Sequence, residues 1–548
     1  MIDGRIVNVA DKAGGVLKLM NGSEVFQACI RFARYKLGAA RAFALFLFTV
    51  LSLAVPLSAN TLYIAQAATG AADGSSCANA HNIAFFNNGA NWGAGASQIG
   101  PGTTLHLCGT ISQGMGSTAL TFLGSGTSGS PITLLFEPGA ILTSPAWSSS
   151  TGAISCNSQS FLVIDGGNDG LIVNTSNGTS LANKIDSIGV SCRLSPNVEI
   201  KNLTIANMYV HVGGSSDENQ FGTGIEISAS DHSKVHNNTI HDASVGIHYN
   251  YIRAGNTDVN IYSNTISNCN WNIGGGDENA GATVSNLNIH DNDLCCMANW
   301  DDAGADLLHH NDIFIFAMNG GNISNYNIYN NYMHGDPGGF STACFFFQGK
   351  ASNISIFNNV IAPTPQANAT GLIYIDGNSA SVTTALIANN TIVGPTSSGG
   401  NGINFGTSVT GVTIRNNIFS TLGTAIYSPA TSSTFTASNN NVMFGIAGPV
   451  GVVTYNNNSY SSVAAWRAAS GFDTSSITSN PNLDSNYRLT LGSPTIAAGA
   501  NLTALSLAID NDKAGNPRPL VGPWDMGAYQ FALITRPLPP SGLAAMVQ

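Results

Sequence analysis

The chain repeats one short arrangement in which apolar residues flank a polar pair. Seven copies occur between residues 235 and 419: VHNNTI, IYSNTI, IHDNDL, IYNNYM, IFNNVI, IANNTI and IRNNIF. Their second Asn residues are Asn238, Asn264, Asn292, Asn331, Asn359, Asn390 and Asn417, which are 26, 28, 39, 28, 31 and 27 residues apart. This pattern predicts a strand, a sharp bend and a second strand in each repeat.

A second family of apolar segments lies between these copies. Its members are GIEIS (from residue 224), GIHYN (246), DIFIFA (312), LIYIDG (372), GINFG (402) and AIYSP (425). Three short strands in each repeat of roughly 25 to 30 residues, stacked about 4.8 Å apart, describe a parallel β-helix. The sequence therefore predicts an all-β solenoid.

The repeated Asn has a structural explanation that we prefer to a ligand-binding role. Asn tolerates left-handed backbone conformations, and its amide can bond to the equivalent Asn of the next coil. We expect a ladder of Asn side chains at the bend.

Composition agrees with this fold and limits the possible partners. The chain has 61 Gly and only 9% charged residues, which favours short strands and tight turns over helices. Its net charge of −11, with only 19 Lys plus Arg, excludes a basic surface for nucleic acid. A uronate polymer would need a local basic patch or a bridging cation.

Residues 31–59 predict export. Basic residues precede an apolar run that ends in small residues, as in a secretory signal peptide, with a membrane anchor as the alternative. Beyond this segment the chain has eight cysteines, an even number that suits an oxidising compartment. We expect the bridges Cys77–Cys108 and Cys156–Cys192, and the cysteine spacing disfavours zinc.

The repeated phrases, their period and the predicted export resemble the right-handed parallel β-helix proteins of the pectate lyase-like superfamily. The tail DSNYRLTLGSPTIAAGA…AIDNDKAGNPRPLVGPWDMGAYQF (484–531) is similar to the choice-of-anchor Q segment. The resemblance implies a right-handed single-stranded β-helix with an N-terminal cap and a C-terminal β extension. The expected divisions are an extension with signal peptide (1–59), the β-helix (60–450), a C-terminal capping segment (451–531) and a flexible tail (532–548).

The candidate chemistry gathers where one repeat is longest. The extra residues fall between Asn292 and Asp312, which predicts a loop above one outward face of the helix. Alignment of the second strand family places Glu226, His248 and Phe314 at one outward position. The expected catalytic residues are Asp312, Asp302, Asp301 and His310. The expected substrate-binding residues are Glu226, His248, Trp300, His309, His334, Asp336 and Lys350.

Three functions fit these residues. Paired carboxylates suit glycosidic hydrolysis of a polysaccharide, which needs one acid and one base or nucleophile and no cofactor. A polysaccharide lyase would instead need a base and a cation, for which the carboxylates could bind Ca²⁺, with Arg253 and Lys350 as the nearest basic residues. A non-enzymatic glycan-binding or adhesion protein is the third. We expect an extracellular monomer, secreted or at the cell surface, without a membrane span.

Overall fold

The computed structural model describes residues 60–531, with gaps at 96, 179–180, 182, 212–220, 298–299, 301–311, 318–319, 339–342, 365–370, 395–399 and 506. At 312 and 314–317 it describes the backbone alone. The predicted signal peptide and flexible tail lie outside the described residues.

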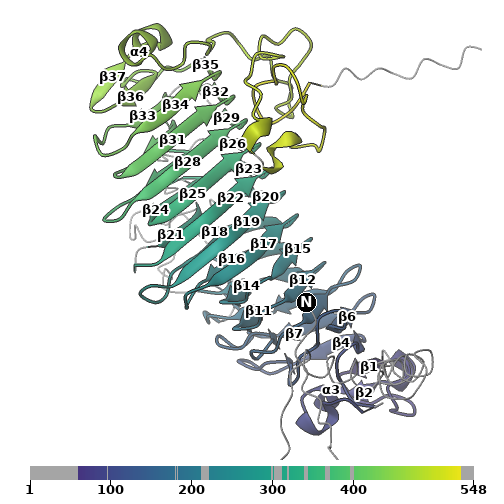
Figure 1. Ribbon diagram of the computed structural model, residues 1–548. Helices are drawn as coiled ribbons and strands as arrows, with labels where there is room; N and C mark the ends of the chain where they lie inside the picture. The colour runs from purple at the N-terminus through teal and green to yellow at the C-terminus, as the bar shows by residue number, and fades with distance from the viewer. Residues whose placement is uncertain are drawn as a thin grey trace, which may run out of the picture. The chain divides into compact units, whose positions relative to one another are not determined.

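Most strands belong to three long parallel sheets that run along the molecule (Figure 1). Sheet 1 contains, in spatial order, β2 (His81–Asn82), β1 (Thr61–Ala65), β3 (Thr104–Leu107), β6 (Ile132–Phe136), β9 (Leu162–Asp165), β12 (Val198–Lys201), β15 (Lys234–His236), β17 (Asn256–Tyr262), β19 (Thr283–His290), β22 (Asn322–Tyr329), β25 (Ala351–Phe357), β28 (Val382–Ala388), β31 (Val409–Arg415) and β34 (Phe435–Asn439).

The two other sheets share the long strands β16 (Thr239–Asn250) and β18 (Thr265–Gly276), whose halves pair in different sheets. Sheet 2 contains their first halves with β4 (Thr110–Ser112), β7 (Ile141–Ser144), β10 (Leu171–Asn174), β13 (Thr204–Ala206), β20 (Asp293–Cys295), β23 (Tyr332–Gly335), β26 (Val360–Pro363), β29 (Thr391–Val393), β32 (Ile418–Ser420) and β35 (Val442–Phe444). Sheet 3 contains their second halves with β11 (Ile188–Arg193), β14 (Thr223–Ser228), β21 (Asp312–Ala317), β24 (Phe345–Gly349), β27 (Ile373–Asp376), β30 (Asn401–Phe405), β33 (Thr424–Ser428), β36 (Val453–Tyr455) and the antiparallel β37 (Asn458–Tyr460).

The remaining elements are short. They are the strand pair β5 (Leu120–Thr121) and β8 (Ile154–Ser155), the helices α3 (Ile83–Phe86) and α4 (Val463–Ser470), and the 3₁₀ turns η1 (Cys77–Asn79), η2 (Gly89–Asn91), η4 (Thr503–Leu505) and η5 (Ala508–Asp510).

The strand pairing confirms the predicted parallel β-helix. From β9 to β36 each coil contributes one strand to each sheet, and apart from the β36–β37 pair the ladders of the three sheets are parallel. Parallel strands joined by crossovers prefer a right-handed connection, which agrees with the predicted hand. Inward side chains such as Ile225, Ile247 and Ile273 stack in register and are fully buried, so that the core continues from coil to coil.

The predicted Asn ladder is present. In each step the side-chain amide and the backbone N–H of one Asn donate to the Oδ1 of the next, as from Asn264 to Asn292 at 3.0 Å for both bonds. The ladder extends one coil beyond the predicted copies, to Asn441, whose amide donates to buried Asp473 at 3.0 Å. Low dielectric strengthens such buried, fully bonded amides.

One part of the expectation for this Asn was wrong. The left-handed conformation belongs to the residue before it, as at Asn330 (φ 57°), Asn358 (φ 56°) and Asn389 (φ 54°). The first residue of each polar pair therefore adopts the left-handed conformation that turns the backbone. The second residue, the ladder Asn, forms the side-chain hydrogen bonds to the neighbouring coil.

The first residue of the pair also holds the C-terminal segment, drawn in yellow beside the last coils in Figure 1. Its side-chain amide donates to a backbone carbonyl of that segment in four successive coils. These bonds run from Asn358 to Asn511 (2.7 Å), Asn389 to Asp525 (3.1 Å), Asn416 to Ala500 (2.8 Å) and Asn440 to Ala498 (3.0 Å). The division into a helix domain (60–450) and a capping segment (451–531) stays a prediction.

Lys513 joins this segment to the helix one coil earlier, where its Nζ donates to the carbonyl of Asn330. Burial lowers the pKa of Lys513 to about 8, against the opposing charges of Asp291 and Asp293. The Lys513 ammonium of the folded protein therefore loses its proton at a lower pH than that of the unfolded chain. As the pH rises from about 8 to the ordinary lysine pKa, the free energy of unfolding gains at most about 3 kcal/mol from this residue.

We compare the melting temperature of the wild type with that of a Lys513→Met variant. The wild-type value minus the variant value should increase as the pH is raised from about 8 to the ordinary lysine pKa. Thermal unfolding followed by circular dichroism measures the difference. Lys234→Met, at an exposed lysine on β15, is the matched control and should show no such trend. A pH-independent difference for Lys513→Met would contradict the assignment.

Both predicted disulfides are present. They join Cys77 to Cys108 and Cys156 to Cys192. A third joins the adjacent Cys295 and Cys296, whereas Cys269 and Cys344 are buried thiols. Within the described range, no helix is long and apolar enough to span a bilayer.

Candidate functional site

One outward position of sheet 3 carries the predicted residues Glu226 and His248. The backbone register pairs Glu226 with His248, His248 with Gly274 and Gly274 with Phe314. This register agrees with the expected alignment of the strand family. Equivalent residues of neighbouring coils lie about 4.8 Å apart, so the side chains of Glu226 and His248 emerge side by side.

Asp312 is displaced by one residue from its expected place. The alignment that brings Phe314 level with Glu226 and His248 brings Asp312 level with Gly224 and Gly246, two residues earlier, but the backbone of Asp312 pairs with Trp271 across an irregularity between Trp271 and Ile273. That extra residue in β18 could not be read from the strand pattern, because a bulge leaves the apolar alternation on either side intact.

Glu226 is a buried carboxylate that is held on two sides. Ser191 donates its hydroxyl to Oε2 at 2.7 Å, and Arg193 donates from Nη1 to Oε1 at 2.8 Å. Only 8% of its side chain is exposed, against 43% for Arg193. Both partners come from β11, the preceding coil of the same sheet. A buried carboxylate needs such partners to remain charged.

Arg193 binds a second carboxylate, that of Glu278. Its Nη2 donates to Glu278 Oε2 at 3.2 Å, and the amide of Asn250 donates to the other oxygen. Burial alone would lower the pKa of Arg193, but its bonds to Glu226 and Glu278 outweigh this effect and raise the pKa above its usual value. One guanidinium thus fixes two carboxylates from different coils.

His248 lies beside this group and is partly exposed. Burial lowers the pKa of His248 below its ordinary value and the positive charge of Arg193 acts in the same direction, while Glu226 and Glu278 oppose them. The imidazole is therefore neutral at neutral pH and can accept a proton.

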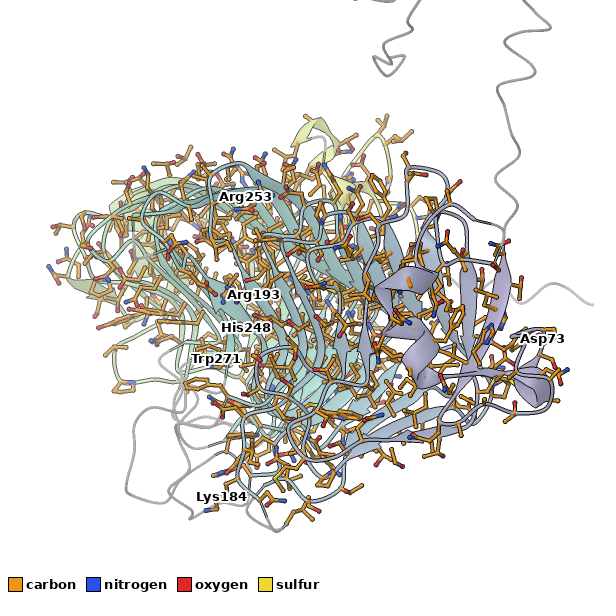
Figure 2. The ribbon with its side chains drawn as sticks, turned by 90° about the horizontal axis from the view of Figure 1, so that it is seen from below. Asp73, Lys184, Arg193, His248, Arg253 and Trp271 are labelled. Atoms are coloured by element: carbon orange, nitrogen blue, oxygen red, sulfur yellow. A yellow bond between two sulfur atoms is a disulfide. The ribbon has the colours of Figure 1, made fainter. Side chains whose placement is uncertain are left out.

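Trp271 completes the group on the next coil. Gly274, its neighbour in β18, has no side chain, and a Cβ placed there would lie 2.6 Å from the indole Cε3 of Trp271. The indole therefore lies over the strand at the position that follows His248 in the row. It is partly exposed, and Figure 2 shows Arg193, His248 and Trp271 in succession along one side of the helix.

The other predicted binding residues do not join this group. Trp300 is fully buried, with its ring stacked on His211 at 4.7 Å and its Nε1 donating to Asn268 at 3.1 Å. A sugar platform requires an exposed ring face, which Trp300 lacks. Trp300 is therefore a buried packing residue.

His334 lies on sheet 2 rather than sheet 3, on strand β23. Its Nε2 is 2.6 Å from Asp293 and its ring stacks on Tyr332 at 4.0 Å. Asp336 follows the same strand and accepts the backbone N–H of Gly338 at 3.0 Å. Lys350 is exposed and directly follows β24, a strand of sheet 3. Strand β24 lies two coils beyond β18, which carries Trp271.

Asp301, Asp302, His309 and His310 lie outside the described residues, and the side chain of Asp312 does too. The carboxylates considered for Ca²⁺ are among these residues. In the part of the chain that is described, no three Asp, Glu, His or Cys side chains are close enough to hold one metal ion.

Sequence reasoning missed several members of the group. Ser191 and Arg193 were within reach, because GVSCR aligns with GIEIS when the strand family is extended by one coil. Nothing in the local pattern GGGDEN (274–279) marks the bond of Glu278 to Arg193. Trp271 was missed because its segment WNIGGG (271–276) is not among the aligned strand segments, although its backbone pairs in register with the coil that carries His248.

Comparisons with known proteins complete the description. No family model matches the sequence, and no curated protein matches it. Among solved structures, the pectate lyase Pel9A is 15% identical, with a TM-score of 0.44, over 86% of this chain and 96% of that one. The PL6 family alginate lyase AlyGC is 13% identical, with a TM-score of 0.44, over 77% of this chain and 55% of that one. The GH136 lacto-N-biosidase from Eubacterium ramulus is 12% identical, with a TM-score of 0.37, over 80% of this chain and 74% of that one.

Proposed function

We propose that the protein is a glycoside hydrolase that cleaves a polysaccharide on the outward face of sheet 3. The observation that carries the proposal is the pair of carboxylates, Glu226 and Glu278, bound to the single guanidinium of Arg193 beside neutral His248. Ionised carboxylates can activate water or stabilise positive charge on the anomeric carbon.

The acid of the reaction is assigned to the long loop and the strand that follows it. The backbone of Asp312 pairs with that of Trp271, and Asp301 and Asp302 precede Asp312 in the sequence. In this assignment Asp312 donates a proton to the leaving oxygen, while His248 and Trp271 position the sugar. Trp271 offers an apolar surface of the kind that sugar rings stack on.

The charge of the group favours a neutral sugar at the cleavage point. Two carboxylates and one guanidinium leave an excess of one negative charge while His248 is neutral. A uronate would be repelled there, whereas the hydroxyls of a neutral sugar can donate to the carboxylates.

A screen of the purified protein on neutral and uronate polysaccharides tests the proposal. We expect new reducing ends from a neutral polysaccharide, with the same rate after treatment with a chelator. An Asp312→Asn variant should lose this activity and keep the β-sheet circular dichroism spectrum. Cleavage that requires Ca²⁺ or occurs only on uronates would overturn the proposal.

One observation favours lyase chemistry as the second candidate. A neutral His248 next to Arg193 provides a base and a cation on one face, which β-elimination beside a uronate carboxylate needs. Lyase products absorb in the ultraviolet because they carry an unsaturated uronate, and hydrolase products do not. Ultraviolet absorbance of the products therefore separates the two candidates directly.

A further inference from the structure

A hollow in the N-terminal cap lies apart from the reaction face. It has a volume of about 280 Å³ and is lined by Ala68, Ala72, His81, Asn82, Ala84, Phe85, Asn88 and Asn91. These residues belong to β2, α3 and the turns around them, whereas the proposed reaction site lies on β11 to β18. Figure 2 shows Asp73, next to the lining residue Ala72, on the cap and distant from Arg193 and His248.

Phe85 provides a rigid aromatic surface in this hollow. Its neighbour Phe86 is fully buried and packs edge-on against Trp92, with ring centroids 5.0 Å apart, which fixes α3 to the core. Phe85 itself is partly exposed and stacks on His81 at 3.9 Å with an interplanar angle of 4°. His81 in turn lies against Gly74, where an added Cβ would be 2.6 Å from the imidazole. His81 covers one side of Phe85 and the ring also packs against the core, so the part that stays exposed is the part that lines the hollow.

The polar groups around Phe85 suit hydroxyls. The Oδ1 of Asn82 accepts the N–H of Phe85 at 3.1 Å, and the Oδ1 of Asn88 accepts that of Ala90 at 3.1 Å. These bonds fix the two amides and leave their NH₂ groups as donors for a ligand. Asp73 follows the lining residue Ala72 and supplies an exposed carboxylate, whose pKa is lowered mainly by its hydrogen bonds to Ser75.

We infer that this hollow binds one neutral sugar unit of a glycan and is a non-catalytic attachment site at the end of the helix. The apolar face of a pyranose contacts the exposed part of Phe85 in the hollow, and its hydroxyls bond to Asn82 and Asn88. The Asp73 carboxylate accepts from a hydroxyl and disfavours uronates by charge repulsion. The inference does not require that the protein cleaves glycans.

Binding of defined oligosaccharides tests the inference. The probes are cello-, xylo- and chito-hexaose and hexagalacturonate, measured by titration calorimetry on a Glu226→Gln background that removes the proposed cleavage. We expect at least one neutral probe to bind and hexagalacturonate to bind more weakly. Phe85→Ala should lower the affinity by about tenfold, as expected for the loss of an aromatic contact.

Two further variants control for damage to the cap. Phe85→Tyr keeps the ring and should keep the affinity, and Leu491→Ala truncates an apolar side chain that is 79% exposed elsewhere and should have no effect. Unchanged affinity in Phe85→Ala, equal binding of hexagalacturonate, or no binding of any neutral probe would overturn the inference. Phe85-dependent binding by a protein that cleaves none of the polysaccharides would support it and count against the hydrolase alone.

Discussion

Replacement of Glu226 by Gln is expected to lower the rate of glycan cleavage by about two to four orders of magnitude, the range typical for loss of an acid or base group. Gln keeps the shape of the side chain and can still accept the hydroxyl of Ser191, but it removes the charge that Arg193 balances. The guanidinium then retains Glu278 as its one carboxylate partner in the group. The site loses its negative excess, and with it the stabilisation of positive charge at the anomeric carbon.

Initial rates on the best substrate of the polysaccharide screen measure this effect. Glu199→Gln is the matched control, because Glu199 is also a glutamate bonded to a cation, Lys201 at 3.0 Å, but lies on sheet 1. Its activity should equal that of the wild type. If Glu226→Gln kept half or more of the activity while folding normally, the reaction would have to take place elsewhere on the molecule.

Replacement of Asn331 by Ala is expected to lower the free energy of unfolding by about 4 kcal/mol. The Oδ1 of Asn331 accepts both the backbone N–H and the side-chain amide of Asn292, at 3.1 and 3.0 Å, and its own amide donates to Ile289 at 2.9 Å. Truncation leaves two donors of Asn292 and the carbonyl of Ile289 unpaired in a fully buried position. Each unpaired buried group costs about 1 to 3 kcal/mol, and relaxation of the turn recovers part of the sum.

Equilibrium unfolding in urea measures the loss. Asn327→Ala provides the comparison, since Asn327 also donates to an Asn of the previous coil, Asn288 at 2.9 Å, but is partly exposed to water. Water can replace that bond, so we expect a loss of about 1 kcal/mol or less. Equal losses in the two variants would mean that burial does not set the strength of the ladder.

The fold was predictable from the sequence because the same strand and bend pattern recurs in coil after coil. Seven copies of one phrase fix the period, and the spacing of apolar residues fixes which side chains face inward. The pairing of Cys77 with Cys108 and of Cys156 with Cys192 also followed from the sequence. The left-handed turn was assigned to the wrong residue of the pair, because Asn at either position tolerates it and only the backbone distinguishes them.

The site was predictable only in part, because it is assembled from irregular positions. Glu226 and His248 followed from alignment of regular strands. Asp312 is offset by the irregularity between β18 and β21, Trp271 lies in a segment outside the aligned strand family, and Glu278 reaches the group from beyond the end of β18. His334 was grouped with the other histidines by its place in the sequence, but its strand belongs to another face. Alignment of repeats predicts only positions that follow the repeat, so residues at irregular positions could not be assigned to the site from the sequence.

The way in which the C-terminal segment is attached limits how this protein can change in length. From Asn330 to Asn440 the C-terminal segment is bonded to the bends of five successive coils. An added or deleted coil in that stretch would move these bends away from the groups of the segment that bond to them. The coils with Asn238, Asn264 and Asn292 carry the same internal ladder, and among the described residues no such bond from the segment to their bends is seen. We therefore expect the fold to accept an added whole repeat on the N-terminal side of Asn330 more readily than between Asn330 and Asn440.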